Sequence, residues 1–534
     1  MLALGAGPAQ AQAPVPIPTL NVPPAPTYIG SPATPNPITG IPATPQNPFM
    51  APNGVSEIHD DGWQTDVNRW GGPLGRAPQQ ASSYLMRDCG SITFDRQGRV
   101  ISICVGASGP QLYMFDPGSL ETLASFQLPP RQHLPSNIFQ DFTGGGYFYL
   151  DNQDRVVAAT TTHHIYVIGE TPSAPGFTLV RDYPLTSALS SSEDITSALP
   201  DSNGLLWFVT KIDGVVGTLN LASGQIHTIH LGNGTEGEIE NSFATDQNGG
   251  VYIATNRKLY RFGAGSNGVP QIVWQLTYPN SGEHKPGQVD DGTGTTPTVM
   301  PGGYVNITDN ADPMDIVVYR TAAHPTKVVG GGRHRHRVAL SRQVCQIPIF
   351  AKGASADENS VISAGRIMIA ENNYGYNDPT SIQGKVTPPG FVRVDLNADG
   401  NGCRQVWANT TESAPTVVSK LALANGLVYT YTTDPNGDWY WTALDARRGN
   451  VVYKVLAGNG LGYNNNYAGI SISPAGTEYL GALGGIMALR DAVPTPQPPP
   501  PAASAAPPAR PKRRHVTQRR AGRRRHRAAA RFTG

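Results

Sequence analysis

Short apolar segments alternate with glycine- and asparagine-rich turns along most of this chain. The stretches 241–262 (NSFATDQNGGVYIATNRKLYRF) and 195–221 (ITSALPDSNGLLWFVTKIDGVVGTLNL) show the pattern most clearly. Each reads as a strand of small residues, a tight turn, a strand of β-branched and aromatic residues, a second turn and a third strand. The pairs Asn203-Gly204 and Gly249-Gly250 permit the positive φ that two-residue hairpins need. The pattern predicts antiparallel sheets built from hairpins.

The unit recurs along the chain, with weaker copies near residues 90 and 144. Later copies begin near residues 194, 240, 295, 358, 412 and 465, at intervals of 46 to 63 residues. A four-stranded unit of this length is typical of a β-propeller blade. Eight units can be counted, and the last, residues 465–491, holds only about two strands. We therefore expect an all-β fold, a single propeller of eight blades or alternatively seven, whose ring is closed by a strand from residues 57–88.

Two blades resemble known propeller families. The segment 440–454 (YWTALDARRGNVVYK), through Ala443-Leu444-Asp445-Ala446 and Gly449, resembles the blade motif of quinoprotein-dehydrogenase-like (PQQ-like) propellers. The segment 201–221 resembles a blade of streptogramin-lyase-like propellers. The chain as a whole is similar to secreted bacterial propellers of uncharacterised type. The resemblance implies the fold, and no cofactor carries over because the Trp-docking motifs of PQQ-like repeats are missing.

The composition agrees with such a fold. Gly (60) and Pro (48) together make up about a fifth of the 534 residues, and charged residues only 15%, against ~25% in average soluble domains. Coiled coils and helical bundles are excluded, since they need Ala, Glu, Lys and Leu. No apolar run reaches the ~18 residues of a membrane-spanning helix.

The two ends differ from the body. Residues 1–13, with the small-residue run Ala9-Gln10-Ala11-Gln12-Ala13, are interpreted as the remnant of an export signal whose start lies upstream, or else as a disordered leader. Residues 14–56 are Pro-rich and expected as a disordered linker, followed by the propeller (57–491) and a Pro/Ala-rich linker (492–509). Export predicts a secreted or cell-envelope location.

Residues 510–534 form a basic tail. It holds 11 Lys and Arg and no acid, so residues 1–509 carry 29 basic against 39 acidic side chains. Like charges at this density predict disorder, and they suit a polyanion such as an envelope polymer; the alternative is a tail that only aids solubility. The expected polyanion-binding residues are Arg513, Arg514, Arg519, Arg520, Arg523, Arg524, Arg525 and Arg527.

Four cysteines, an even number, fit an oxidising compartment. Cys89 and Cys104 flank a strand–turn–strand, so a hairpin can bring them opposite each other. Cys345 and Cys403 lie on strand-like segments of adjacent units. We expect these two disulfides, with free thiols as the alternative.

Acids and amides, scarce elsewhere, recur just before the first strand and just after the second strand of several units. In a propeller both positions face the same rim of the central channel. We therefore expect a ligand- or metal-binding site there, made of Glu240, Asn241, Asp309, Asn310, Glu358, Asn359, Glu371, Asn372 and Asn465. The alternative is that Asn and Asp serve local turn hydrogen bonds.

Three functions follow from these features. Oxygen donors around a channel suit Ca²⁺, and gluconolactonase-like propellers place a metal in a similar way. The leading interpretation is an exported binding protein, a monomer, whose rim takes a small ligand or metal and whose tail holds an anionic envelope polymer. A calcium-dependent lactonase or esterase is the first alternative and a cell-surface interaction scaffold the second. Whether the chain is an enzyme stays open.

Overall fold

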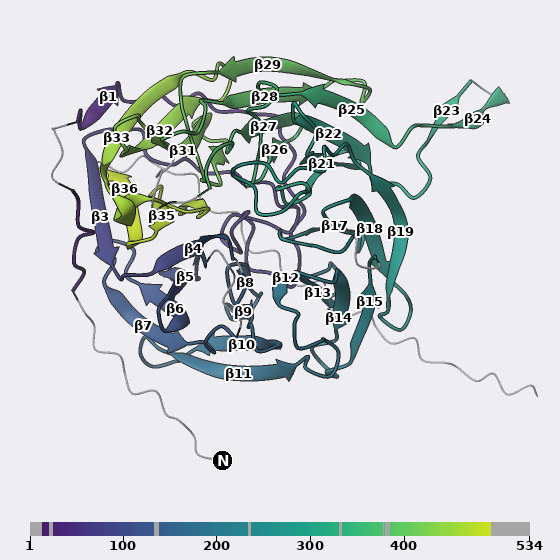
Figure 1. Cartoon of the computed structure of the whole chain (residues 1–534), viewed down its shortest axis with the longest axis horizontal. Coiled ribbons are helices and arrows are strands. Elements are labelled where there is room, and N and C mark those ends of the chain that lie inside the picture. Colours follow the sequence, from purple (N-terminus) through teal and green to yellow (C-terminus); the bar gives the residue numbers. More distant parts are fainter. Residues whose placement is uncertain are drawn as a thin grey trace, which may run out of the picture. The chain divides into compact units, whose positions relative to one another are not determined.

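Eight four-stranded units stand around a central channel in the computed structural model (Figure 1). The structure describes residues 13–20, 25–132, 138–141, 143–232, 236–330, 334–377, 379 and 385–492. The basic tail and residues 1–12 lie outside the described residues. The prediction of an all-β, eight-bladed propeller is confirmed.

Each blade is an antiparallel sheet whose strands follow one another outward from the channel. The strands of the first four blades are β4 (Asp88–Phe94), β5 (Val100–Gly106), β6 (Gly109–Phe115) and β7 (Thr122–Gln127); β8 (Phe148–Leu150), β9 (Val156–Ala159), β10 (His164–Glu170) and β11 (Phe177–Pro184); β12 (Ile195–Pro200), β13 (Leu206–Thr210), β14 (Val215–Leu219) and β15 (Ile226–His230); and β16 (Ala244–Thr245), β17 (Val251–Ala254), β18 (Lys258–Ala264) and β19 (Pro270–Thr277).

The second half of the ring repeats this order. Its strands are β20 (Thr298–Met300), β21 (Tyr304–Thr308), β22 (Asp315–Arg320) and β25 (Gln343–Pro348); β26 (Ile362–Ala364), β27 (Ile367–Glu371), β28 (Phe391–Leu396) and β29 (Cys403–Asn409); β30 (Lys420–Ala422), β31 (Leu427–Thr433), β32 (Asp438–Asp445) and β33 (Val451–Asn459); and β34 (Ile470–Ile472), β35 (Glu478–Ala482) and β36 (Gly485–Asp491). In the fifth blade a hairpin, β23 (Thr326–Val329) and β24 (His336–Ala339), projects from the ring (Figure 1).

The ring closes between the two ends of the propeller. Strand β3 (Pro78–Tyr84) pairs antiparallel with β36 from Pro78↔Asp491 to Tyr84↔Gly485 and becomes the outer strand of the eighth blade. The two carboxylate oxygens of Asp491 also accept the backbone N–H groups of Leu74 and Arg76, each at 2.8 Å. Closure by a strand from residues 57–88 is thus confirmed.

A segment that spans the end of the expected linker (14–56) and the start of the range expected to close the ring (57–88) runs through the channel. Residues 47–70, here called the channel segment, form hydrogen bonds with the inner strand of every blade. Backbone carbonyls of the segment accept N–H groups from most inner strands, and side chains of the segment donate to the third and eighth blades. The pairs, with the residue of the channel segment first, are Val55–Phe94, Ser56–Leu150, Asn47–Pro200, Gly62–Thr245, Trp63–Val299, Thr65–Ser363, Asp66–Leu421 and Trp70–Ile472; Asn47 and Trp70 donate, and the other six accept.

The channel segment is held by a buried ion pair as well as by backbone bonds. Strand β2 (Val67–Asn68) runs parallel to β30. The fully buried Lys420 ammonium lies 2.6 Å from Oδ1 of Asp66 and 3.5 Å from Oδ2 of Asp60. The segment therefore belongs to the core of the molecule (Figure 1, purple trace across the ring).

The Pro-rich stretch before the channel segment makes more contacts than a free linker would. Strand β1 (Tyr28–Gly30) adds to the outer strand β33, and the N–H groups of Ala33, Asn36 and Ile38 donate to backbone carbonyls at 2.7–2.9 Å. Proline removes its own N–H group, but the residues between prolines keep theirs. These hydrogen bonds fix residues 28–38 against the propeller.

Both expected disulfides are confirmed. Cys89 and Cys104 face each other across the β4–β5 ladder, with their Cα atoms 4.0 Å apart. Cys345 on β25 and Cys403 on β29 join the outer strands of the fifth and sixth blades, with their Cα atoms 5.7 Å apart. Among the described residues, no helix is long and apolar enough to cross a membrane.

Candidate functional site

A cavity of about 710 Å³ opens at the face where the inner strands begin. Every blade except the third contributes the residues just before, or at the start of, its inner strand. These residues are Asp88, Gly90 and Ser91; Gly146 and Tyr147; Asn241; Thr296; Glu358, Asn359 and Ser360; Val418; and Asn466 and Tyr467. The cavity therefore lies at the rim where the starts of the inner strands meet.

The channel segment forms the floor. Ile58 and His59 line the cavity from below. His59 Nδ1 lies 3.1 Å from Oδ1 of the buried Asp66. Its Nε2 lies 3.3 Å from the Thr296 hydroxyl, at the start of the fifth blade. The imidazole is therefore fixed between the segment and the ring.

Apolar side chains form much of the wall. Ile103, Val105, Phe139, Leu461 and Leu483 line the cavity. Met86, at its mouth, is 73% exposed. An apolar wall with a few polar groups is typical of sites for small organic ligands, which commonly occupy 300–1,000 Å³.

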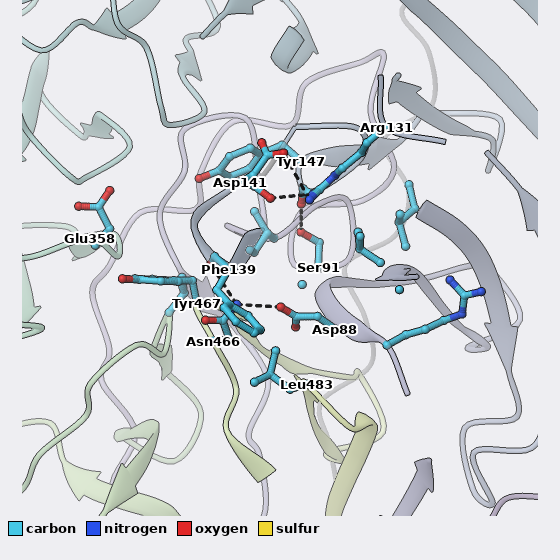
Figure 2. Close-up of a pocket in the computed structure, with 18 of the residues that line it drawn as sticks. Asp88, Ser91, Arg131, Phe139, Asp141, Tyr147, Glu358, Asn466, Tyr467 and Leu483 are labelled. Carbon is cyan, nitrogen blue, oxygen red and sulfur yellow. Dashed lines mark hydrogen bonds and ion pairs between the residues drawn. The ribbon is translucent and has the colours of Figure 1, made fainter. Parts of the chain in front are cut away.

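Polar groups on the first-blade side are mostly paired (Figure 2). Asn466 Nδ2 donates to Oδ2 of Asp88 at 2.9 Å and thereby ties the eighth blade to the first. The Ser91 hydroxyl donates to the Gly146 carbonyl. Arg131 Nη1 lies 3.3 Å from Oδ2 of Asp141. Burial raises the pKa of Asp88 to about 7, against the opposing effects of Asn466 and Arg131.

Glu358 stands apart on the opposite side (Figure 2). Its side chain is buried, and within the described residues neither carboxylate oxygen has a hydrogen-bond partner. Gly294 leaves room for it, since a Cβ there would lie 2.3 Å from Oε2. Burial raises its pKa well above the ordinary value and the charge of Asp290 raises it further, whereas the nearby backbone N–H of Val289 lowers it.

Two tyrosines flank this carboxyl group. Burial raises the pKa of Tyr147 and of Tyr467, and the charge of Glu358 adds to both shifts. The Tyr147 hydroxyl donates to Asn241 Oδ1 at 3.2 Å, and the Tyr467 hydroxyl donates to the Gly287 carbonyl at 3.1 Å. Both hydroxyl groups therefore stay protonated and hold the walls in place.

The nine residues expected at the rim divide into three groups: three that line the cavity, two that lie next to lining residues, and four that bond mainly to the backbone. Asn241, Glu358 and Asn359 line the cavity. Glu240 lies just behind, where Lys211 Nζ binds its Oε1 at 3.0 Å. Glu371 also lies behind the wall, and its two oxygens accept hydrogen bonds from Asn359 Nδ2 and the Ser419 hydroxyl, each at 2.6 Å.

The other four serve the backbone and do not line the cavity. Asp309 Oδ1 accepts the N–H groups of Ala311 and Asp315. Asn310 Nδ2 donates to the Asp291 carbonyl at 2.9 Å, Asn372 Nδ2 to the Ala354 carbonyl at 2.9 Å, and Asn465 Nδ2 to the Ala468 carbonyl at 3.2 Å. At these four positions the contacts are the local turn hydrogen bonds that the alternative interpretation expects.

The oxygen donors do not fit a calcium ion. Among the described residues no group of three or more His, Cys, Asp or Glu has the arrangement that holds a metal. The carboxylate of Glu240 is already bound by Lys211, and both oxygens of Glu371 already accept hydrogen bonds from Asn359 and Ser419. Among the described lining residues, unpartnered buried oxygens belong to Glu358 (both), Asn359 (Oδ1) and Asp88 (Oδ1), whereas Ca²⁺ takes six to eight oxygen ligands.

Several lining residues escaped the sequence analysis. They are His59, Asp88, Ser91, Arg131, Asp141, Tyr147 and Tyr467. Asp88, Ser91, Tyr147 and Tyr467 stand before or at the start of an inner strand, so the strand-start rule extended to aromatic residues and to the first two blades would have found them. His59 carries no such signal, because nothing in the sequence places residues 47–70 in the channel.

Comparison with known proteins gives a partial sequence relative and no family. No family model matches the chain. An uncharacterized protein of Archaeoglobus fulgidus is 26% identical over 274 residues, which cover 48% of this chain and 52% of that protein. The chain therefore matches about half the length of this curated relative.

Solved structures with a similar fold share little sequence with the chain. They include a streptogramin B lyase (12% identity, 77% of this chain and 97% of that one, TM-score 0.40), Sqt1 from Chaetomium thermophilum (12%, 80% and 99%, 0.47) and virginiamycin B lyase from Staphylococcus aureus (11%, 71% and 99%, 0.37). At such identities the likeness concerns the fold alone. Streptogramin B lyase-like β-propellers are thus among the structural neighbours of this eight-bladed chain.

Proposed function

We propose that the chain is an exported binding protein that takes one small, largely apolar molecule into the cavity above the channel segment. The observation that carries this is the cavity itself: about 710 Å³, lined by Ile58 and His59 of the channel segment and by apolar side chains of the blades. Burial of apolar ligand surface there drives binding. The few polar groups, above all Glu358, orient the ligand.

The experiment is a fluorescence titration with N-phenyl-1-naphthylamine, an uncharged apolar dye that brightens in apolar surroundings. Gly90 lines the cavity at a bulge of β4, and a Cβ added there meets no atom within 4 Å. Gly90→Trp therefore has room to fill the cavity. We expect saturable binding to the natural protein and at least tenfold weaker binding to Gly90→Trp.

The matched control is Thr178→Trp, which adds the same indole to an exposed position on the outer strand β11. It should bind the dye as the natural protein does. Equal binding by all three proteins, or no saturable binding by any, would contradict the proposal.

Export and envelope attachment belong to the same proposal. Two disulfides suit an oxidising compartment. Residues 510–534 carry 11 basic side chains and no acid, which favours attraction to an anionic envelope polymer by release of counterions. In this account the tail holds the propeller at the cell envelope while the cavity binds the ligand.

A further inference from the structure

We propose that the cavity selects ligands with a protonated amine, and that Glu358 is the residue that receives this group. The inference deepens the proposed function and rests on it. Its starting point is a carboxyl group that is only 6% exposed, lines the cavity and has no side-chain partner for either oxygen within the described part of the chain. The backbone N–H of Val289 lies near enough to lower its pKa, but no cationic side chain among the described residues lies beside it. Such a group is costly to bury unless a partner is supplied.

The charged groups acting most strongly on Glu358 have the wrong sign to be that partner. They are the carboxyl groups of Asp290, Glu240 and Asp357. Of these, Asp357 is fully buried in its own turn, and Glu240 is bound to Lys211. Burial raises the pKa of Asp290 and of Asp357 to about 8, so these acids hold protons while the cavity is empty. A bound cation favours the ionised form of Glu358, and a bound anion disfavours it.

The basic side chains of the lining are paired with other groups. Arg131 is bound to Asp141 on the first-blade side, away from Glu358 (Figure 2). Arg87 donates to the Gly109 carbonyl at 2.9 Å and to the Ser108 hydroxyl at 2.6 Å. His59 faces Asp66 through Nδ1 and the hydroxyls of Thr296 and Ser360 through Nε2.

An ammonium group fits the remaining place. It carries three N–H donors, and the two free oxygens of Glu358 can accept two of them. A hydrogen bond between two charged groups is roughly twice as strong as one between neutral groups. The aromatic rings of Tyr147 and Tyr467 line the same part of the cavity and add cation–π attraction. A neutral alcohol gains only the weaker hydrogen bond, and a carboxylate brings a further negative charge into a buried cluster of acids.

Head-group competition tests the inference. The dye N-phenyl-1-naphthylamine is bound to the full-length protein and displaced by octylamine, 1-octanol or octanoate at pH 7.5, ligands that share one chain length and differ in charge. We expect octylamine to displace the dye at a concentration at least tenfold below that of octanol, and octanoate to be the weakest. Octanol or octanoate competing as well as octylamine would overturn the inference.

Two glutamine variants locate the effect. Glu358→Gln should raise the octylamine concentration needed to displace the dye at least tenfold, and should change the octanol concentration by no more than about twofold. The control is Glu478→Gln, since Glu478 is equally buried, also has an unpartnered oxygen, and lies on β35 outside the cavity lining; it should keep the amine preference. A preference that survives Glu358→Gln would also overturn the inference. A third outcome separates the two proposals. If the dye binds the natural protein, Gly90→Trp blocks this binding, and the three octyl ligands compete equally, this inference is overturned and the proposed function stands.

Discussion

Buried carboxyl groups gather around the starts of the inner strands, and their protonation sets how stability depends on pH. Asp357 is the simplest case because burial is the main cause of its shift. It is fully buried, its Oδ1 accepts the Asn359 N–H at 3.0 Å, and its pKa is raised from 3.8 to about 8. The folded protein thus holds a proton there that the unfolded chain loses near pH 4.

The first prediction concerns Asp357→Asn. Because the folded-state pKa is above the unfolded value, the native protein loses stability as pH rises from about 4 to about 8. The amide resembles the protonated acid and never ionises. We expect the variant to match the natural protein at pH 4 and to exceed its unfolding free energy by roughly 2–4 kcal/mol at pH 9.

Urea denaturation at the two pH values measures this difference. The exposed Asp399 provides the control, because Asp399→Asn should show no such dependence. If the difference in unfolding free energy between Asp357→Asn and the natural protein were the same at both pH values, burial would not raise the pKa of this carboxyl group.

The candidate site could be predicted only in part at this scale. The strand-start rule found Asn241, Glu358 and Asn359, because blade topology alone brings such positions to one rim. It could not separate them from Asn310 or Asn372, since amides that serve a turn and amides that face a ligand occupy the same sequence positions. Their roles depend on which neighbours lie within hydrogen-bond distance, and this follows from the packing of adjacent blades.

At the scale of elements, the channel segment is the feature that distinguishes this propeller from an open ring. Its carbonyls meet inner strands in blade order, and Lys420 fixes it to β30. Blades could be predicted because each repeats a local strand-and-turn pattern. The channel segment could not, because its residues follow no strand pattern and their contacts are with residues far along the chain.

The second prediction is that Lys420→Met releases the channel segment. The substitution leaves Asp66 and Asp60 buried without their cation, and such a loss costs about 3–5 kcal/mol. We expect a matching drop in unfolding free energy and faster cleavage within residues 47–70 in limited proteolysis.

Arg257→Met is the comparison, because the Arg257–Asp291 pair is partly exposed and should contribute less than about 1 kcal/mol. If Lys420→Met proved no more destabilising than Arg257→Met, the channel segment would not depend on the buried ion pair.

The third prediction concerns the disulfides. They close loops of 15 and 58 residues, which in the chain-entropy model stabilise the fold by about 3 and about 4 kcal/mol. Replacing both Cys345 and Cys403 by Ala should therefore destabilise the protein at least as much as replacing Cys89 and Cys104. Denaturation under non-reducing conditions compares the pairs, and peptide mapping that found four free thiols would remove the basis of the prediction.

At the scale of the whole molecule, the chain combines a propeller with a basic tail that lies outside the described residues. The two parts should act independently, because the fold closes on itself through β3 and β36. Deleting residues 510–534 should release the protein from the cell envelope and leave its melting temperature within about 1 °C, since the deletion removes no residue of the propeller. The measurement is cell fractionation at low and high salt, where attachment through counterion release should weaken as salt rises. Envelope association unchanged by the deletion at both salt concentrations would contradict the anchoring role.

The central claim is that one small apolar molecule occupies the cavity above the channel segment. Native mass spectrometry of the full-length protein with N-phenyl-1-naphthylamine counts bound molecules directly. The account predicts one bound molecule per chain for the natural protein and for Thr178→Trp, and none for Gly90→Trp at the same dye concentration. No bound dye on the natural protein, or the same number on Gly90→Trp, would contradict it.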